Sequence, residues 1–215
     1  MLRMRFYCLL VALISTNLCI AMEYDDINKT LERLYDTARN LKNLNTHDQF
    51  ELFNETFELF KMIKHDPEIE LIKQEHLAHL AFRAATIAFL DNSEIDRSIP
   101  LYSFVVHSDA PTDIRSAAAL SLANIYLRKK KFIAAEFYNA IAQKNWPQEE
   151  SKGFLFLSKA RVQFAKNNLA SAQSHYELCM QNTDEPDIVE SALEELSVLK
   201  KMKQNDNKNC KCIIL

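Results

Sequence analysis

The chain has 215 residues, of which 48% are hydrophobic and 26% charged, which is enough for one or two domains with a real core. Its single glycine excludes folds and sites that need several, such as β-hairpin turns and phosphate-binding loops. The net charge of −3 gives no bulk attraction to nucleic acid, and we expect no nucleic-acid partner.

Residues 1–21 have the pattern of a secretory signal peptide. Arg3 and Arg5 precede a short apolar run, and small residues follow that run at the place of cleavage. We expect cleavage between Ala21 and Met22. An uncleaved N-terminal anchor and a mis-assigned start are the alternatives.

The rest of the chain is expected to be all-α. Apolar residues recur at three- and four-residue spacing, which places them on one face of a helix. The expected helices cover residues 27–44, 48–64, 69–90, 94–107, 112–128, 132–144, 150–166, 169–181 and 188–202. The expected organisation is an N-terminal helical pair in 22–66, and helical repeats with a C-terminal capping helix in 67–203.

The clearest helix pair runs from Ile114 to Pro147. Ala123 and Ala135 are small residues where two antiparallel helices would touch, and Tyr126 follows the first of them. This pattern resembles the tetratricopeptide repeat family. The next pair repeats the same separation between Ala160 and Ala172. The resemblance implies antiparallel helix pairs in a short right-handed solenoid.

The same resemblance implies a binding role in which the first helices of successive pairs line a concave groove for a protein or peptide. The groove residues that it implies are Asn124, Arg128, Arg161 and Phe164. The clamp for peptide carboxylates known in the family is not implied, because Leu120 and Leu157 stand where its polar residues are expected.

No residue pattern indicates catalysis, a cofactor or a metal. His76 and His79 are three residues apart, whereas the helix of a zinc protease needs its histidines four residues apart with a glutamate after the first. No Ser/His/Asp or Cys/His arrangement is legible in the sequence. We therefore expect no enzymatic activity and no cofactor, with a hydrolase built from scattered histidines as the alternative.

Residues 204–215 are expected to form a flexible tail with a lipidation signal. The tail ends in Cys212 followed by two isoleucines and a leucine, with Cys210 and several lysines nearby. This ending resembles the prenylation box of Ras-type small GTPases. The resemblance implies a geranylgeranyl group on Cys212 and an acyl group on Cys210, which together would hold the chain on a membrane.

The two ends of the chain point to different compartments, because prenyl transfer occurs in the eukaryotic cytosol. Three interpretations are open: the box occurs by chance, the start is not a cleaved signal, or an intracellular bacterium exports the protein into a host that lipidates it. Our expectation is a non-catalytic protein-interaction scaffold that is exported to the periplasm or the medium. The alternative is an effector or adaptor tethered to a host membrane by prenylation.

Overall fold

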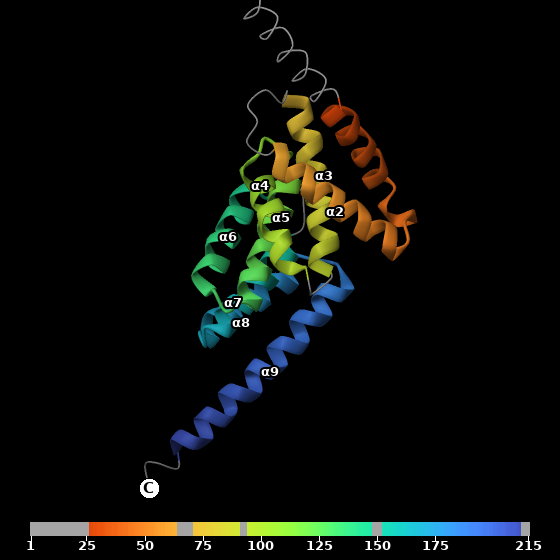
Figure 1. Ribbon diagram of the computed structural model, residues 1–215. Helices are drawn as coiled ribbons and strands as arrows, with labels where there is room; N and C mark the ends of the chain where they lie inside the picture. The colour runs from red at the N-terminus through yellow and green to blue at the C-terminus, as the bar shows by residue number, and fades with distance from the viewer. Residues whose placement is uncertain (1–25, 64–70, 91–93, 148–151, 212–215) are drawn as a thin grey trace, which may run out of the picture.

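The computed structural model describes residues 26–63, 71–90, 94–147 and 152–211. The expectation of an all-α fold is confirmed, because every regular element within these ranges is a helix. A first helix covers residues 26–39, and a short 3₁₀ helix, Leu41–Asn43, follows it. The remaining helices are α2 (Thr46–Ile63), α3 (Leu71–Leu90), α4 (Ile95–His107), α5 (Thr112–Arg128), α6 (Phe132–Asn145), α7 (Gly153–Ala165), α8 (Leu169–Gln181) and α9 (Pro186–Lys211) (Figure 1).

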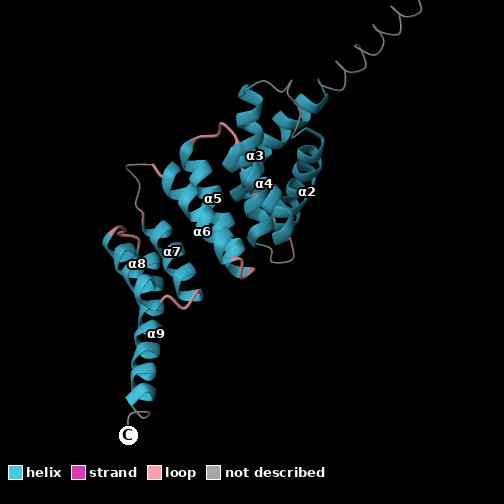
Figure 2. Ribbon diagram, turned by 90° about the vertical axis from the view of Figure 1, so that its left-hand side faces the viewer, coloured by secondary structure: helices cyan, strands magenta, loops and turns pink. Residues whose placement is uncertain are grey.

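The helices from α3 onward form consecutive antiparallel pairs, α3 with α4, α5 with α6 and α7 with α8, and α9 packs on α8 (Figure 2). Helices α3, α5, α7 and α9 also contact one another in succession, and we call them the inner row. Helices α4, α6 and α8 form the outer row. The turns inside the second and third pairs lie at the same edge of the molecule as the C-terminal end of α9, and we call this the turn edge (Figure 2).

Equivalent buried positions recur every 37 residues from α3 to α9. In the inner row the completely or almost completely buried sets are Ala81, Ala118, Leu155 and Ala192, and Ala88, Ile125, Val162 and Leu199. In the outer row they are Ser98, Ala135 and Ala172, and Val105, Ala142 and Cys179. The spacing holds in α9, so this last helix occupies the place of a fourth inner helix.

The turns of the second and third pairs have the same backbone geometry. Lys130 and Asn167 are 37 residues apart, and both adopt the left-handed conformation, with φ of 56° and 60°. In each turn the following N–H reaches back to a carbonyl five residues earlier, at 2.8 Å and 2.9 Å respectively. This is the Schellman arrangement, which satisfies carbonyls at the end of a helix.

A series of lysines with the same spacing joins each inner helix to the outer helix before it. Lys129 at the end of α5 pairs with Asp96 in the first turn of α4. The Nζ of Lys166 lies 2.6 Å from Glu136 Oε1 on α6. The Nζ of Lys203 donates to the side-chain carbonyl of Gln173 on α8 at 2.8 Å. These three contacts connect successive pairs along the turn edge.

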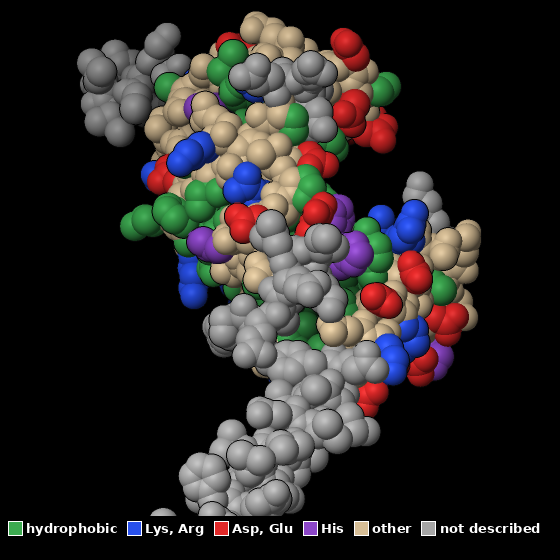
Figure 3. All heavy atoms as spheres, turned by 90° about the horizontal axis from the view of Figure 1, so that it is seen from above, with side chains coloured by type: hydrophobic (Ala, Val, Ile, Leu, Met, Phe, Trp, Pro, Cys, Tyr) green, Lys and Arg blue, Asp and Glu red, His purple; other side chains and the backbone are tan. Residues whose placement is uncertain are grey.

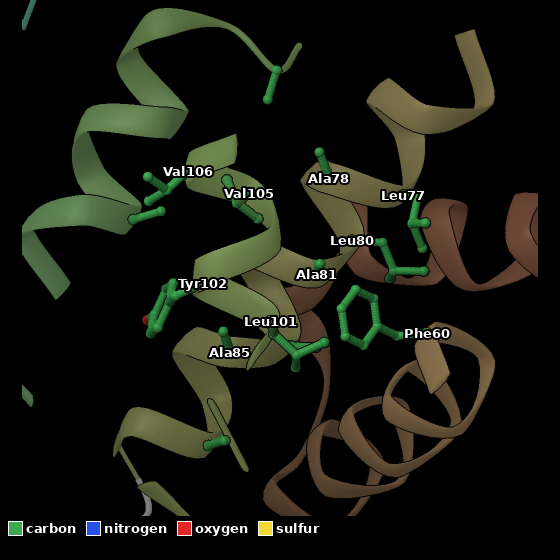
Figure 4. Packing of buried hydrophobic residues seen from close by; sticks show 14 of the residues in the cluster. Phe60, Leu77, Ala78, Leu80, Ala81, Ala85, Leu101, Tyr102, Val105 and Val106 are labelled. Carbon is green, nitrogen blue, oxygen red and sulfur yellow. The ribbon is translucent and has the colours of Figure 1, made fainter. Parts of the chain in front are cut away.

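Apolar side chains from neighbouring helices fill the core (Figure 4). In the larger cluster Phe60 of α2 lies against the α3 and α4 side chains, among them Leu80 and Leu101. A second cluster joins α7, α8 and α9 around Tyr176 and Leu199. The phenylalanines of α2 therefore serve packing, since Phe60 is 3% exposed.

Two expected boundaries are wrong. Helix α9 continues to Lys211, whereas we expected it to end near residue 202 and to give way to a flexible tail. The apolar period does stop there, but the segment has no glycine or proline, and Gln204 stands where Lys130 and Asn167 turn the chain back. The first expected helix, 27–44, ends instead at residue 39.

Candidate functional site

The four expected groove residues lie on two neighbouring helices of the inner row. Asn124 and Arg128 belong to the last two turns of α5, and Arg161 and Phe164 belong to α7. These two helices contact each other, and α7 also contacts α9. Each of the four residues also contacts a neighbouring part of the same chain.

Arg161 is joined to α9 by a two-pronged ion pair. Its Nε and one terminal nitrogen donate to Glu195 Oε1 at 2.9 Å and 2.7 Å. The hydroxyl of Tyr176, on α8, donates to the other carboxylate oxygen at 2.7 Å. Burial and the Glu195 carboxylate raise the pKa of Tyr176, so its hydroxyl keeps its proton and acts as a donor. This cluster fixes α9 to the last helix pair.

Asn124 and Arg128 link α5 to its inner-row neighbours on either side. The side-chain oxygen of Asn124 accepts a hydrogen bond from the Ser158 hydroxyl of α7 at 3.3 Å. The guanidinium of Arg128 lies over the ring of Phe89 in α3, 4.7 Å from its centroid. Arg128 is nevertheless exposed.

Phe164 is half-buried and packs against the second core cluster. Three of the four expected residues therefore take part in packing between helices, and Arg128 is the most accessible of the set. Their part in binding a peptide stays a prediction.

A polar cavity of about 250 Å³ lies between α6, α7 and α8. Asn139, on its wall, is 3% exposed, and neither atom of its amide has a hydrogen-bond partner among the described residues. The equivalent positions 37 residues before and after it are Tyr102 and Tyr176, whose hydroxyls are hydrogen-bonded. The short asparagine thus leaves a cavity where the flanking repeats place an aromatic ring.

Burial lowers the pKa of Lys159, which lies on the wall of this cavity and donates to Gln143 Oε1 at 2.5 Å. Across it, Lys166 holds the pKa of Glu136 below its usual value, chiefly by a hydrogen bond to the carboxylate. The polar groups of the wall are thus mostly bonded to each other, and the Asn139 amide is the exception.

The sequence analysis missed an exposed apolar pair on α6. Ile133 is 84% exposed and Phe137 56%, and together with Lys130 and Lys131 they line an open hollow at the turn edge. The signal was present in the sequence. The buried face of this helix contains Ala135 and Ala142, and two large apolar residues four positions apart stand on the other side.

The histidines singled out in the sequence lie on α3 at the N-terminal end of the molecule. The His76 ring stacks on Tyr35 with centroids 4.3 Å apart, and burial lowers the pKa of His79. Within the described ranges no group of three or more His, Cys, Asp or Glu side chains has the geometry to hold a metal ion. None of the helices in those ranges combines the length and the apolar character needed to span a bilayer.

The expected processing and lipidation sites lie mostly outside the described residues. Ala21, Met22 and Cys212 are outside them, and Cys210 belongs to the last turns of α9. Cys179, by contrast, is a buried free cysteine whose thiol pKa is raised by burial. Comparison of the chain with protein-family models, with curated proteins and with solved structures finds no match.

Proposed function

We propose that the chain is a non-catalytic protein-interaction scaffold of the tetratricopeptide-repeat type, whose inner row binds a protein or peptide. The observation that carries this proposal is the 37-residue register, which extends through buried positions, turns and interhelical lysines from α3 to α9. Stacked helix pairs with one repeated register form a right-handed solenoid in this family, and such solenoids present an extended concave surface.

The inner row supplies chemistry that suits a peptide. Asn124 offers an amide, Arg128 an exposed guanidinium, and the half-buried Leu120 an apolar contact on the same helix. Backbone amides and one acidic or aromatic side chain of a peptide would be matched by these groups. A bound carboxylate near Arg161 would have to compete with Glu195 for the guanidinium, so we place the binding site toward α5 rather than α9.

The test is a selection of displayed random peptides against the full chain, followed by photo-crosslinking. A photoreactive residue placed at Arg128 should capture the enriched peptides, and one placed at Glu177 on the exposed side of α8 should not. The variant Asn124→Ala/Arg128→Ala should weaken binding at least about tenfold, the loss of one charged and one neutral hydrogen bond. Equal capture at Glu177, or unchanged binding by the double variant, would contradict the proposal.

Export is part of the same proposal, with Ala21 and Met22 as the cleavage pair, and it is supported by the sequence of residues 1–21 alone. N-terminal sequencing of the protein from its native setting tests it, with Met22 as the expected first residue. Met1 at the mature terminus would remove the export hypothesis.

The second candidate is a membrane-tethered adaptor, and the course of α9 favours it. This helix leaves the body of the molecule and ends at Lys211, directly before Cys212 (Figure 1). A lipid on Cys212, and a second on Cys210, would thereby be held clear of the helix pairs. Expression of residues 22–215 in a eukaryotic cell should place a larger share of the wild type than of Cys212→Ser in the membrane fraction, whereas equal distribution of the two would make the box a coincidence.

A further inference from the structure

Four of the eight large apolar side chains that the described residues expose form two pairs, one on α6 and one on α9, toward the turn edge. Ile133 and Phe137 stand one helical turn apart on α6. Val198 and Met202, 49% and 40% exposed, repeat the same spacing in the middle of α9, 74 residues after Asn124 and Arg128 in the 37-residue register. Single exposed apolar residues are ordinary on a soluble protein, but such pairs on one edge mark an interaction surface. We call these four residues, with the lysines beside them, the basic apolar edge.

The lysines of this edge flank both apolar pairs. Lys130 and Lys131 are exposed at the α5–α6 turn and line the same hollow as Ile133 and Phe137. Lys200 and Lys201 are exposed on α9 between Val198 and Met202.

Positive charge is concentrated in this part of an otherwise acidic protein. Between Leu196 and Gln204 α9 has three lysines and no acidic residue. Because the net charge of the whole chain is −3, the remaining residues together carry a net charge of −6. On the side of the molecule away from the C-terminal end of α9, acidic and basic side chains are both spread among uncharged ones (Figure 3).

We propose that the basic apolar edge binds the surface of an anionic lipid bilayer. The four apolar side chains enter the boundary between headgroups and acyl chains, while the lysines meet anionic headgroups. The proposal goes beyond the scaffold function and does not depend on lipidation of Cys212, although the C-terminal end of α9 lies at this same edge (Figure 2).

The arrangement fits a bilayer better than nucleic acid or an acidic protein. The phosphodiester backbone of a nucleic acid would pair with the lysines, but it would offer no contact to aliphatic side chains such as Ile133 and Val198. A protein groove would have to match two separate helices at once, whereas a lipid surface adapts to any outline.

The test uses the full chain after bacterial expression, where no prenyl group is added, and sedimentation with vesicles. Vesicles of phosphatidylcholine alone are compared with vesicles containing 30% phosphatidylserine. Binding should require phosphatidylserine and should weaken more than tenfold between about 0.02 M and 0.3 M salt, because screening shortens the reach of the lysine charges. Lys130→Glu/Lys131→Glu should weaken it at least about 30-fold, and Ile133→Ser/Phe137→Ser about tenfold or more.

Two variants at the opposite end of the helices serve as matched controls. Lys144→Glu reverses an exposed charge in the last turn of α6, and Met62→Ser removes a side chain that is 65% exposed on α2. Both should bind within about twofold of the wild type. The same measurements on residues 22–215, the mature chain of the export proposal, separate this edge from residues 1–21, whose apolar run and arginines would bind anionic vesicles by themselves.

Circular dichroism verifies the fold of each variant, and Phe137→Ser alone replaces any double variant that does not fold. Binding without dependence on phosphatidylserine, no binding at all, or equal effects of test and control variants would overturn the proposal.

Discussion

At the scale of single residues, the only glycine of the chain marks a close approach. Gly153 opens α7 and is buried against Thr183 in the loop before α9, so that a Cβ on residue 153 would lie 2.5 Å from the Thr183 Cβ. No rotation of the threonine relieves a clash that involves its own Cβ. Gly153→Ala should therefore destabilise the chain by about 1–3 kcal/mol in urea unfolding.

The control for this prediction is the background in which the partner Cβ is absent. When Gly153→Ala is made in the Thr183→Gly background, the added methyl group meets no Cβ. The loss in free energy of unfolding caused by Gly153→Ala should then fall to a fraction of its value in the wild type. Thr183→Ala keeps the Cβ and should give no relief. An equal cost in all three backgrounds would show that the contact is not the cause.

At Asn139 we expect replacement of a polar side chain by an apolar one to stabilise the fold. A buried amide without partners costs about 1–3 kcal/mol, and an apolar side chain of similar size has no such cost. Asn139→Leu should raise the free energy of unfolding by about 1–2 kcal/mol. Asn124→Leu is the matched control, since its oxygen accepts from Ser158, and it should not stabilise.

At the scale of elements, the two equivalent turns differ in the residue that adopts the left-handed conformation. A lysine Cβ makes this conformation unfavourable, whereas asparagine tolerates it and glycine adopts it freely. Lys130→Gly should stabilise the protein by about 0.5–1 kcal/mol in urea unfolding, and Asn167→Gly by less. A larger gain at Asn167 than at Lys130 would mean that the two turns do not share one geometry in solution.

The attachment of α9 depends on Glu195, which is bonded to Arg161 and to Tyr176 at once. Both ionic side chains are about one third exposed, so the ion pair itself contributes little, and the bond from the buried Tyr176 hydroxyl contributes more. Tyr176→Phe and Glu195→Gln should each cost about 1–2 kcal/mol, and the double variant less than their sum. Strict additivity in urea unfolding would contradict a shared cluster.

At the scale of the whole molecule, α9 closes the array. A chain ending after Lys203 keeps the buried Leu199 and the bond to Gln173, and its free energy of unfolding should stay within about 0.5 kcal/mol of the full chain. A chain ending after Asp184 uncovers Tyr176 and Cys179 and should aggregate or lose its cooperative transition, because terminal repeats need a cap. Equal stability of the two would remove the capping role.

How far the sequence predicts this fold depends on which signal each helix carries. Strong apolar periods place α5, α6 and α8 within a residue or so of their observed bounds, because the buried alanines and tyrosines repeat at helical spacing. The 37-residue register of α3 and α4 escapes sequence analysis, since the position equivalent to Ala123 is Thr86 and the position equivalent to Ala135 is Ser98. Both are small, but neither looks like a core residue before the structure shows Ser98 buried.

The candidate site is less predictable than the fold. The sequence predicts that Arg161 belongs to the inner row. It does not predict that the Arg161 guanidinium forms an ion pair with Glu195, thirty-four residues later. Local patterns cannot reveal which distant carboxylate meets an arginine. The exposed Ile133 and Phe137 stand outside the apolar face that the sequence predicts for this helix, but exposed apolar residues are too common on soluble proteins to indicate a site by themselves.

The lysine series of the turn edge makes the length of this molecule modular. Lys129, Lys166 and Lys203 each join an inner helix to the outer helix before it. The two middle units, α5–α6 and α7–α8, therefore contain both a connector for the preceding unit and an acceptor for the following one. A copy of one unit inserted between α6 and α7 would meet complementary surfaces on both sides. Nothing in the packing of a middle pair sets a maximum number of pairs, and growth stops where a helix continues past Gln204 instead of turning. By this reasoning the same parts would build a longer protein with the same two ends.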